Sequence, residues 1–405
     1  MGYVAVRGGR QAIEASLELL EWERVRSGAS VTVKDIQAAF PDLIDQIMGE
    51  SSLYAPELAA LVLKQAQGSV EEAVFLLRAF RSTLERPHVS RVIETRKMHA
   101  SRRISAVLKD VPGGQILGAT RDYSHRLTDF DLRSEDADVV AKMRAQMESL
   151  YAKEVSGTQD ESGLTKEENY CCPLPKVSDY LRKEGLIVDY ERDDTIPADV
   201  TMEPTTIPFP RSARLQILAR GMTQAVNAFG YAAIRGFGQA HPTVAELRYG
   251  TVDVLVDLPS GNDKEEQSYY IGSIPVTEVE SLFAKEVTDA QGEARLEFAV
   301  GYGMVLGRNE TKAIAMSVLD NSLSCGDSQF PTQDEEFVLY HVDSVEATGF
   351  ISHLKLPHYV TFQSKLSRVR KTQSESDSSR ELAARSEAKE QETKIKHDTK
   401  MVILT

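Results

Sequence analysis

The chain has 405 residues, of which 41% are hydrophobic and 27% are charged, so it can bury one large core or two modest ones and is unlike a disordered chain. It contains no apolar run of about eighteen residues and begins without the basic-then-apolar layout of a signal peptide, so we expect no membrane span, no secretion and a cytoplasmic protein. The formal net charge of -14 disfavours a non-specific nucleic-acid binder, which needs Lys and Arg in excess, so any anionic ligand must be held by a local basic pocket.

The N-terminal segment reads as a helical unit, which we place at residues 1–100. Tyr3–Val6 is expected to form a short strand closed by glycines, and helical periodicity follows it. Apolar spacing predicts helices over Val33–Met48, Pro56–Gln67 and Ser69–Leu84. The last of these begins with a capping-box pattern, a serine followed three residues later by a glutamate, which satisfies free N–H groups in the first turn.

A basic stretch and a glycine-rich turn follow. The basic stretch ends in Arg102 and Arg103, and such a run of charges is most often a solvated helix face. The glycines of the turn Pro112–Gly118 permit backbone conformations and close approaches that bulkier residues forbid. A ligand could therefore sit against this turn.

A cluster of polar side chains comes directly after the turn. Asp122, Tyr123, His125 and Arg126 bring a carboxylate, a phenol, an imidazole and a guanidinium within five positions. These are groups that general acid–base catalysis uses. Chance clustering in a loop is the competing interpretation.

Helical patterns continue into the middle of the chain. Residues 131–168 are acidic and helical in pattern, and Pro173–Glu184 predicts a further short helix. Cys171 and Cys172 are adjacent and far from Cys325, which fits neither a disulfide framework nor a CxxC zinc knuckle, so we expect reduced thiols.

Three arginines form a second candidate for anion binding. A proline-rich connection, residues 197–210, leads to Arg211, Arg214 and Arg220, which lie near one face of a predicted helix, close to its start. Guanidinium groups and free N–H groups at a helix start both favour phosphate oxygens. Ordinary surface arginines are an equally good interpretation.

Strand periodicity appears only in the later part of the chain. Alternating apolar residues predict strands over Thr251–Asp257, Tyr269–Ile274 and Arg295–Val300, and the glycine-bounded residues 230–238 are a further candidate. Helices first and strands later indicate an α+β fold: a helical N-terminal unit followed by a mixed α/β region with antiparallel strands, which we place at residues 101–365.

Two segments at the end of this region resist a simple assignment. Tyr302–Gly307 reads as a glycine-containing turn before a helix over Glu310–Leu319, but it lacks a complete nucleotide-binding pattern. Residues 366–405 are charged and almost free of apolar side chains, so they cannot bury enough surface to offset their ordering entropy. We expect a disordered C-terminal tail.

Two histidines near the start of this tail are candidate metal ligands. His353 and His358 are five residues apart with Pro357 between them, so they can converge only around a turn. Imidazole is a common zinc ligand, but a site needs at least a third donor, which His341, Cys325, Asp343 or another subunit could supply. Surface or packing roles are the alternative.

The chain resembles the I subunit of the bacterial carbon-phosphorus lyase core complex from residue 2 to about residue 363. The loop near residues 156–165 and the charged tail fall outside the likeness. The stretches that carry it are GYVAVRGGRQAI, ELAALVLKQAQGSVEEAVFLLRAFRSTL, RRISAVLKDVPGGQILGATRDYSHRL, PFPRSARLQILARG, GYGMVLGRNETKAIAMSVLD and QDEEFVLYHVDSVEATGFISHLKLPHYVTFQ.

This resemblance implies a reaction and a set of partners. The family works with G, H and J subunits to displace adenine from ATP, bound with Mg²⁺, by methylphosphonate, which gives α-D-ribose 1-methylphosphonate 5-triphosphate. It implies a homodimeric core within a heteromeric complex, with ABC-type ATPase subunits as further candidate partners. It also implies a zinc ion at the interface with the J subunit, where His353 and His358 would meet a cysteine of that subunit.

Roles for the other candidates follow from the chemistry of this displacement. Breaking an N-glycosidic bond develops oxocarbenium character, so a carboxylate near the sugar and a proton donor near the purine both help. We assign catalysis to Asp122, Tyr123, His125, Arg126 and Gln115. We assign phosphate binding to Arg102, Arg103, Arg211, Arg214 and Arg220.

Two other functions fit the same residues. A free-standing purine nucleoside-triphosphate nucleosidase would use water in place of the phosphonate and would need no partner. A non-catalytic scaffold would use the two histidines only to complete an interfacial zinc site.

Overall fold

A computed structural model describes residues 9–157, 174–188, 190, 195–204, 206–236, 241–257, 268–288, 292–326, 329–356 and 358–402. The chain forms two compact units. The larger unit is Glu23–Ala347, and the smaller unit holds the chain ends, up to Trp22 and from Thr348. The predicted strand at Tyr3–Val6 and the cysteine pair at residues 171 and 172 lie outside the described residues.

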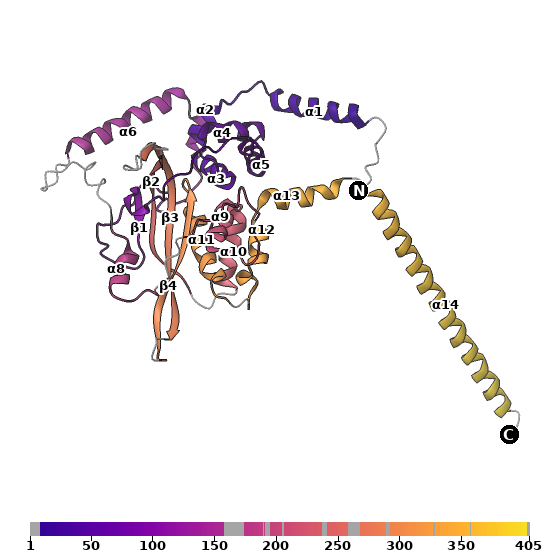
Figure 1. Cartoon of the computed structure of the whole chain (residues 1–405). Helices are drawn as coiled ribbons and strands as arrows, with labels where there is room; N and C mark the ends of the chain where they lie inside the picture. Colours follow the sequence, from indigo (N-terminus) through magenta and orange to yellow (C-terminus); the bar gives the residue numbers. More distant parts are fainter. Residues whose placement is uncertain are drawn as a thin grey trace. The chain divides into compact units, whose positions relative to one another are not determined.

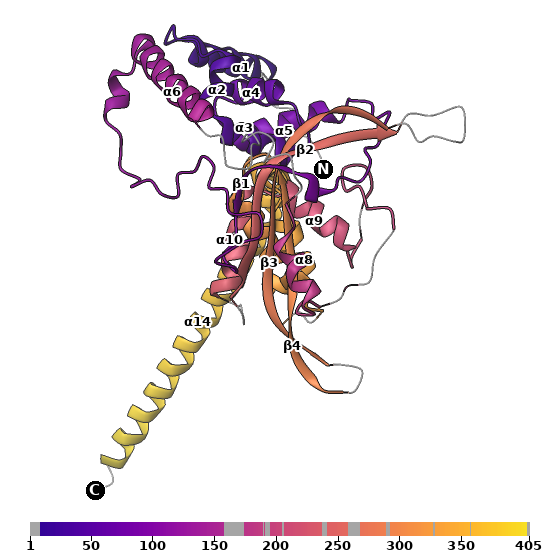
Figure 2. The same ribbon diagram turned by 90° about the vertical axis from the view of Figure 1, so that its left-hand side faces the viewer.

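A four-stranded antiparallel sheet lies at the centre of the larger unit (Figures 1 and 2). Its order follows the chain, from β1 (His99–Ile104) through β2 (Thr243–Asp257) and β3 (Ser268–Thr288) to β4 (Ala294–Leu306). The three strands predicted from alternation lie within β2, β3 and β4, so the predicted α+β class with antiparallel strands is confirmed. Arg102 and Arg103 lie on β1, so the expectation of a solvated helix face there is wrong.

Helices cover one face of this sheet. They are α9 (Arg211–Arg220), α10 (Thr223–Arg235) and α11 (Glu310–Leu323), and they pack on sheet residues such as Val279 and Phe283 to form the main core. The apolar residues of α9 pack in this core and thereby fix the position of the arginines on the same helix.

Glycines allow α11 to approach β4 closely. A Cβ atom at Gly303 would lie 2.0 Å from the Ala313 carbonyl oxygen, and one at Gly301 would lie 2.0 Å from the Ser317 carbonyl oxygen. The predicted turn at Tyr302–Gly307 is therefore wrong, because β4 continues to Leu306 and its glycines serve helix packing.

The predicted strand at residues 230–238 is also wrong. Residues 230–235 end α10, and Gly230 packs against Ala315 of α11, where a Cβ atom would lie 2.8 Å from the Ala315 Cβ. Its small residues signal close helix packing.

Four short helices form a second core, against which Leu306 at the end of β4 packs. They are α2 (Val33–Ala39), α3 (Pro41–Ser51), α4 (Pro56–Gln65) and α5 (Val70–Arg81). The predicted helix over residues 33–48 is two helices, because Pro41 has no N–H group and begins α3. Half of the predicted capping box is present: the Ser69 hydroxyl accepts from the Glu72 N–H at 3.3 Å, whereas the Ser69 N–H donates to the Ala66 carbonyl oxygen.

The opposite face of the sheet is covered by short segments. Here α8 (Val177–Lys183) and the chain around Val111 pack on Ala245 and Leu282. The helix predicted within residues 131–168 is α6 (Ala137–Gly157). The remaining helical segments of this unit are η1 (Thr95–Lys97), η2 (Asp131–Ser134), η3 (Pro331–Gln333) and α12 (Glu335–His341).

The chain ends are helical. They comprise α1 (Gly9–Val25), α13 (Ser344–Ser352), which begins in the larger unit, η4 (His353–Lys355) and α14 (Tyr359–Val402). Residues 366–402 of the segment that we expected to be disordered belong to α14, although its described side chains are almost all exposed, as its composition requires. Among the described residues, no helix is both long enough and apolar enough to cross a bilayer.

Candidate functional site

His353 and His358 are brought together by the turn between α13 and α14. The centroids of their imidazole rings are 5.5 Å apart, and the ring planes are inclined at 62°. His353 Nδ1 contacts the Phe350 carbonyl oxygen, and His358 Nδ1 lies 2.5 Å from the Leu356 carbonyl oxygen. A backbone carbonyl accepts only from a protonated nitrogen, so in both neutral rings Nε2 is left with its lone pair.

The pair fits a metal site that is completed from elsewhere. Two imidazoles with open Nε2 atoms are the donors that zinc prefers, but zinc needs at least one more protein ligand. Within the described part of the chain, no three His, Cys, Asp or Glu residues gather in a way that could hold a metal ion. The predicted third donor Asp343 is bound to Arg78 at 2.6 Å. Pro357, which we expected to shape the turn, lies outside the described residues.

Large hydrophobic side chains at exposed positions precede and follow these histidines in the sequence. They are Phe350, Ile351, Leu354, Leu356, Tyr359, Val360 and Phe362. So many exposed apolar side chains in one segment are typical of a segment that another chain covers.

The predicted catalytic cluster is only partly assembled. Asp122, whose side chain is 50% exposed, accepts from Arg102 Nη2 at 2.6 Å and lies 3.7 Å from Arg126 Nη2. Tyr123 and His125 are exposed and form no hydrogen bond with another described residue. Two guanidinium groups therefore hold the carboxylate, while the phenol and the imidazole face solvent.

Gln115 lies apart from this cluster in its contacts. Its side-chain oxygen accepts from the Ser105 N–H at 3.4 Å. The glycine-rich turn that contains it folds around Arg103, and Gly113 and Gly114 have φ angles of 83° and 78°, in the left-handed region that favours glycine. The turn thus encloses a side chain of this protein.

Arg103 is buried and all three of its side-chain nitrogens donate hydrogen bonds. Its Nε donates to Glu246 at 2.5 Å, Nη1 donates to the Pro112 and Gly114 carbonyls at 2.7 and 3.1 Å, and Nη2 donates to the Pro175 carbonyl at 2.8 Å. Its side chain is 1% exposed. An anion could reach Arg103 only if these contacts were broken.

Arg102 is similarly committed. Its side chain is 6% exposed, and it donates to Glu310 at 2.7 Å, to Asp122 at 2.6 Å and to the Leu117 carbonyl at 2.5 Å. It therefore positions the Asp122 carboxylate and joins the turn to the start of α11.

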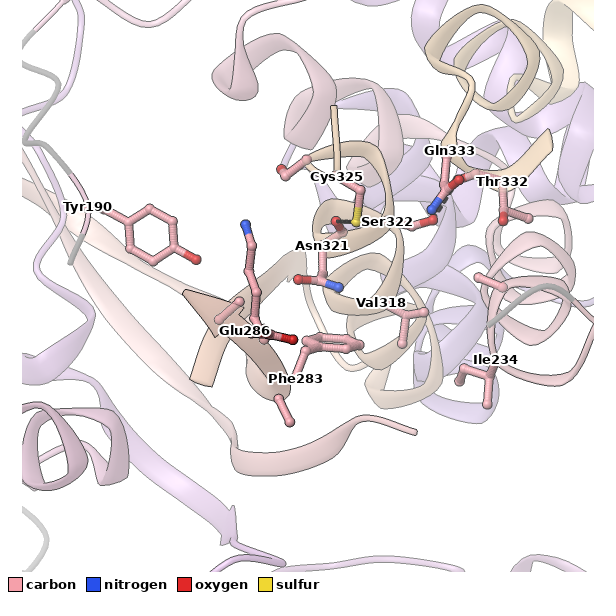
Figure 3. Close-up of a pocket in the computed structure, with 15 residues that line it drawn as sticks. Tyr190, Ile234, Phe283, Glu286, Val318, Asn321, Ser322, Cys325, Thr332 and Gln333 are labelled. Atoms are coloured by element: carbon pink, nitrogen blue, oxygen red, sulfur yellow. Dashed lines mark hydrogen bonds between the residues drawn. The ribbon is translucent and has the colours of Figure 1, made fainter. Parts of the chain in front are cut away.

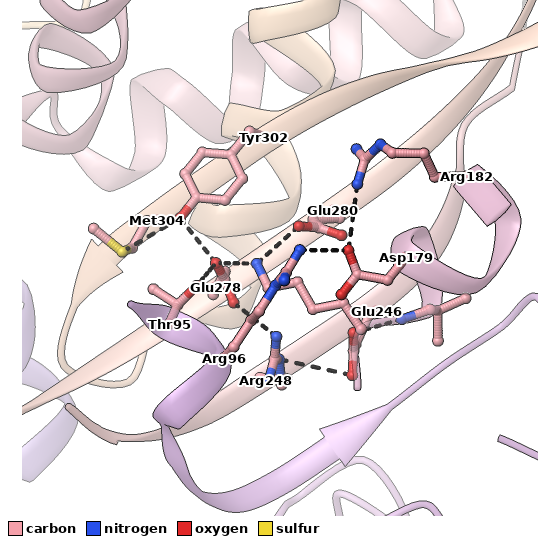
Figure 4. Close-up of polar contacts among 12 residues, drawn as sticks. Thr95, Arg96, Asp179, Arg182, Glu246, Arg248, Glu278, Glu280, Tyr302 and Met304 are labelled. Atoms are coloured by element: carbon pink, nitrogen blue, oxygen red, sulfur yellow. Dashed lines mark hydrogen bonds and ion pairs between the residues drawn. The ribbon is translucent and has the colours of Figure 1, made fainter. Parts of the chain in front are cut away.

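A network of buried charges covers the sheet face beside Arg103 (Figure 4). Lys176 Nζ donates to Glu278 at 2.7 Å and to Glu280 at 2.9 Å, and the Tyr302 hydroxyl donates to Glu278 at 2.9 Å. Burial, followed by the charge of Glu278, raises the pKa of Tyr302 well above its usual value. Burial alone would raise the pKa of Glu278, but Lys176 and Arg248 outweigh it and lower that pKa.

The network is balanced in charge. Arg103, Arg248 and Lys176 face three glutamates, at positions 246, 278 and 280. Such a neutral arrangement anchors the segments around it to the sheet and gives little attraction to a free anion.

The arginines of α9 differ in their partners. Arg211 forms a two-pronged pair with Asp320 at 3.0 and 2.6 Å, and this hydrogen bonding raises the pKa of Arg211. Arg214 pairs with Glu335 at 2.8 Å. Arg220 has no carboxylate within ion-pair distance among the described residues, and its Nη1 donates to the Val200 carbonyl at 3.2 Å.

A cavity of about 490 Å³ opens between α10, α11 and the β3–β4 pair (Figure 3). Its floor includes Phe283 and Val318, and Asn321 and Cys325 add an amide and a thiol. The cavity has the volume of a small-molecule site. No local sequence pattern predicts this cavity, because its lining comes from segments that lie more than a hundred residues apart, from Tyr190 to Gln333.

Two predicted phosphate-binding arginines lie beside this cavity. The Arg211 guanidinium carbon is 6.0 Å from the ring centroid of Tyr190, and Arg214 Nη2 donates to Ser324 at 3.1 Å. Tyr190 and Ser324 both line the cavity.

Comparison with known proteins gives consistent results over nearly the whole chain. The family described as bacterial phosphonate metabolism protein (PhnI) matches residues 2–376. HtxH of Stutzerimonas stutzeri, named as a candidate C-P lyase subunit protein, is 41% identical over 382 residues, which cover 92% of this chain and 96% of that protein.

Two further relatives carry a more specific name. Each is called alpha-D-ribose 1-methylphosphonate 5-triphosphate synthase subunit PhnI. The protein from Rhizobium meliloti (strain 1021) is 39% identical over 388 residues, covering 93% of this chain and 96% of its own. The protein from Escherichia coli (strain K12) is 39% identical over 381 residues, covering 92% and 99%.

Proposed function

The chain belongs to the bacterial phosphonate metabolism PhnI family, and from that premise we propose that it is a catalytic subunit of a cytoplasmic carbon-phosphorus lyase complex. In this proposal it transfers the ribose 5-triphosphate group of ATP from adenine to methylphosphonate. The observation that supports it most is the sequence identity to two relatives that are named for that product. Each is 39% identical over more than nine-tenths of this chain.

The named product defines the bonds that change. An oxygen of methylphosphonate bonds to ribose C1, the C1–N bond to adenine breaks, and its electron pair leaves with the base, which takes up a proton. The 5-triphosphate is retained. Positive charge develops on the sugar in the transition state, so a nearby carboxylate lowers the barrier and a proton donor assists the leaving base.

Asp122 is the carboxylate that we assign to the sugar. Arg102 and Arg126 hold it at the surface, where a substrate can reach it. We assign proton transfer at the base to His125, with Tyr123 as an orienting hydroxyl, because both are exposed beside Asp122 in the sequence. Gln115 supports the adjoining turn in this proposal and does not contact substrate.

The triphosphate requires cations that are not already paired. Arg103 is buried in its own contacts, whereas Arg211 and Arg214 lie beside the cavity but are each paired with a carboxylate. Arg220 is the predicted arginine that lacks such a carboxylate among the described residues. We therefore place the main phosphate contact at Arg220, with Mg²⁺ accompanying the nucleotide as part of the substrate.

His353 and His358 are proposed to hold zinc together with a thiolate of the J-type partner subunit, and G- and H-type subunits complete the assembly around a homodimeric core. Both Nδ1 atoms contact backbone carbonyls, which orients the rings and leaves each Nε2 for the metal. Bound zinc would supply a Lewis acid at this surface. The exposed apolar side chains that flank the histidines in the sequence support burial by another chain.

The proposal is tested by Asp122→Asn and His125→Ala in a complex assembled with all partner subunits. We expect each to lower the rate of adenine release from ATP by at least about a hundredfold, because each removes a group that acts on the reacting atoms. Asp131→Asn is a matched control, since Asp131 is an exposed carboxylate nine positions further on. Undiminished rates in both variants would remove this cluster from the mechanism.

A further inference from the structure

Three arginines lie together where the ends of α5 and α9 meet. Arg78 and Arg81 are in the last turn of α5, and Arg220 is the last residue of α9. Arg78 Nη2 donates to the carbonyl oxygen of Arg220 at 3.1 Å, which joins the two helix ends directly. We call this group the arginine cluster.

The cluster carries more positive charge than its surroundings neutralise. Arg78 pairs with Asp343 at 2.6 Å, whereas Arg81 and Arg220 form no ion pair with any described residue. The neighbouring Arg86 is already paired with Asp199 at 2.8 Å. Helix-end carbonyls offset part of the excess, but they carry only partial charges.

Backbone carbonyls hold these guanidinium groups in place. Arg78 Nε donates to the Glu50 carbonyl at 2.9 Å, and Arg81 Nη1 donates to the Ser51 carbonyl at 2.6 Å. Arg220 Nη1 donates to the Val200 carbonyl at 3.2 Å. These contacts fix one side of each group and leave further N–H donors, so the cluster is rigid before any ligand arrives.

Several polar atoms at this place lack a partner. Arg220 Nε is buried without a hydrogen bond, and so are the hydroxyl groups of Ser51 and Ser344, two residues that are 0% and 2% exposed. Ser51 supplies the carbonyl that holds Arg81, and Ser344 follows Asp343 in the chain. Buried polar atoms are usually satisfied, so the unsatisfied Nε of Arg220, together with two unsatisfied hydroxyls in residues connected to the cluster, supports a missing partner.

Electrostatics agrees with this geometry. Burial, followed by the charges of Arg78 and Arg81, lowers the pKa of Arg220 to about 10, and Asp343 and Glu346 only partly oppose this. Burial, then Arg86 and Arg78, likewise lowers the pKa of Arg81. Two cations at one place are thus held against their own repulsion, and a bound anion would relieve it.

We propose that the arginine cluster is an oxyanion-binding site for a phosphate-type ligand with two or more negative charges. Guanidinium forks match phosphate and phosphonate oxygens, and Arg81 and Arg220 keep N–H donors that no carboxylate of the described residues occupies. The identity of this anion, a nucleotide triphosphate tail or a free phosphonate, depends on the function proposed above. The existence of the binding site does not depend on that function.

The test measures anion binding to the purified full-length chain by calorimetry at low ionic strength, with tripolyphosphate, ATP and methylphosphonate as separate probes. Wild type is expected to bind at least one of them, and Arg220→Gln and Arg81→Gln are each expected to weaken that binding about tenfold or more. Arg220→Lys should lose less, because it keeps the charge. Arg78 is left unchanged, because its contacts with Asp343 and two carbonyls hold the junction together.

Arg144→Gln is the matched control, since it removes one charge from an exposed position on α6. It should bind as wild type does. Binding of tripolyphosphate and ATP alone assigns the site to the triphosphate, and binding of methylphosphonate alone assigns it to the phosphonate. No binding by wild type, or equal losses in Arg220→Gln and Arg144→Gln, would overturn the site. If binding depends on Arg220 but the assembled complex releases no adenine, the site stands and the proposed function fails.

Discussion

At the residue scale, Lys312 illustrates how an unusual side chain can be structural. It is fully buried in α11, and its Nζ donates to the Ala219 and Gly221 carbonyls at 2.7 and 2.6 Å. It thus closes the end of α9, next to Arg220. Burial lowers the pKa of Lys312 to about 8, with Glu50 opposing the shift and Arg78 adding to it.

This shift predicts a pH dependence of stability. Below about pH 8 Lys312 is protonated in both states, and the folded state carries the cost of a buried charge. Between that pH and its ordinary pKa of 10.5, the unfolded state holds a proton that the folded state has lost, so the free energy of unfolding rises with pH. The rise is at most about 3 kcal/mol, at about 1.4 kcal/mol for each pKa unit.

Chemical denaturation of wild type and Lys312→Met across this alkaline range measures the effect. The unfolding free energy of wild type minus that of the variant should increase as pH rises, because the variant has no ionisable group at this position. Because both chains contain the same tyrosines, the comparison cancels the contribution of those residues to the change in unfolding free energy. A constant difference would show that the pKa of Lys312 is not lowered.

At the element scale, local sequence patterns predicted most helices and strands but not which elements pack against one another. The cap at Ser69 and the alternation in β2 to β4 are local signals, and the structure confirms both. Gly303 falls in the predicted turn at Tyr302–Gly307, but it belongs to β4, and its role is visible only when α11 lies on that strand. Sequence alone does not distinguish a glycine in a strand that lets a helix pack closely from a glycine in a turn.

The spacing of the two histidines allowed them to converge around a turn but did not require it. The structure brings the rings close together, and no third donor joins them within the described part of the chain. We expect zinc in the assembled complex to fall to near zero in His353→Ala and in His358→Ala. Elemental analysis of the purified complex measures it.

His341→Ala is the control for this prediction. His341 is exposed, and its Nδ1 also contacts a backbone carbonyl, that of Phe337, at 2.6 Å. It shares this Nδ1 contact with His353 and His358, but those two rings also lie beside each other. Unchanged zinc in both ligand variants, or an equal loss in His341→Ala, would contradict the interfacial site.

At the scale of the whole molecule, charges find partners that are distant in sequence. Arg78 and Asp343 are 265 residues apart, and Arg103 and Glu246 are 143 residues apart. Four of the five arginines expected to bind phosphate pair with carboxylates more than a hundred positions away, which no local pattern indicates. Arg78 and Arg81 were overlooked for the same reason, since they join Arg220 only after folding.

The central claim, transfer of ribose from adenine to a phosphonate, is tested most directly by counting products. The chain, assembled with its partner subunits, is given ATP with and without methylphosphonate, and free adenine and ribosyl phosphonate are quantified together. We predict that, with the partners present, adenine release depends on methylphosphonate and equals the ribosyl phosphonate in amount. Adenine release that is the same with and without methylphosphonate, and the same with and without partners, would contradict this claim and indicate a free-standing nucleosidase.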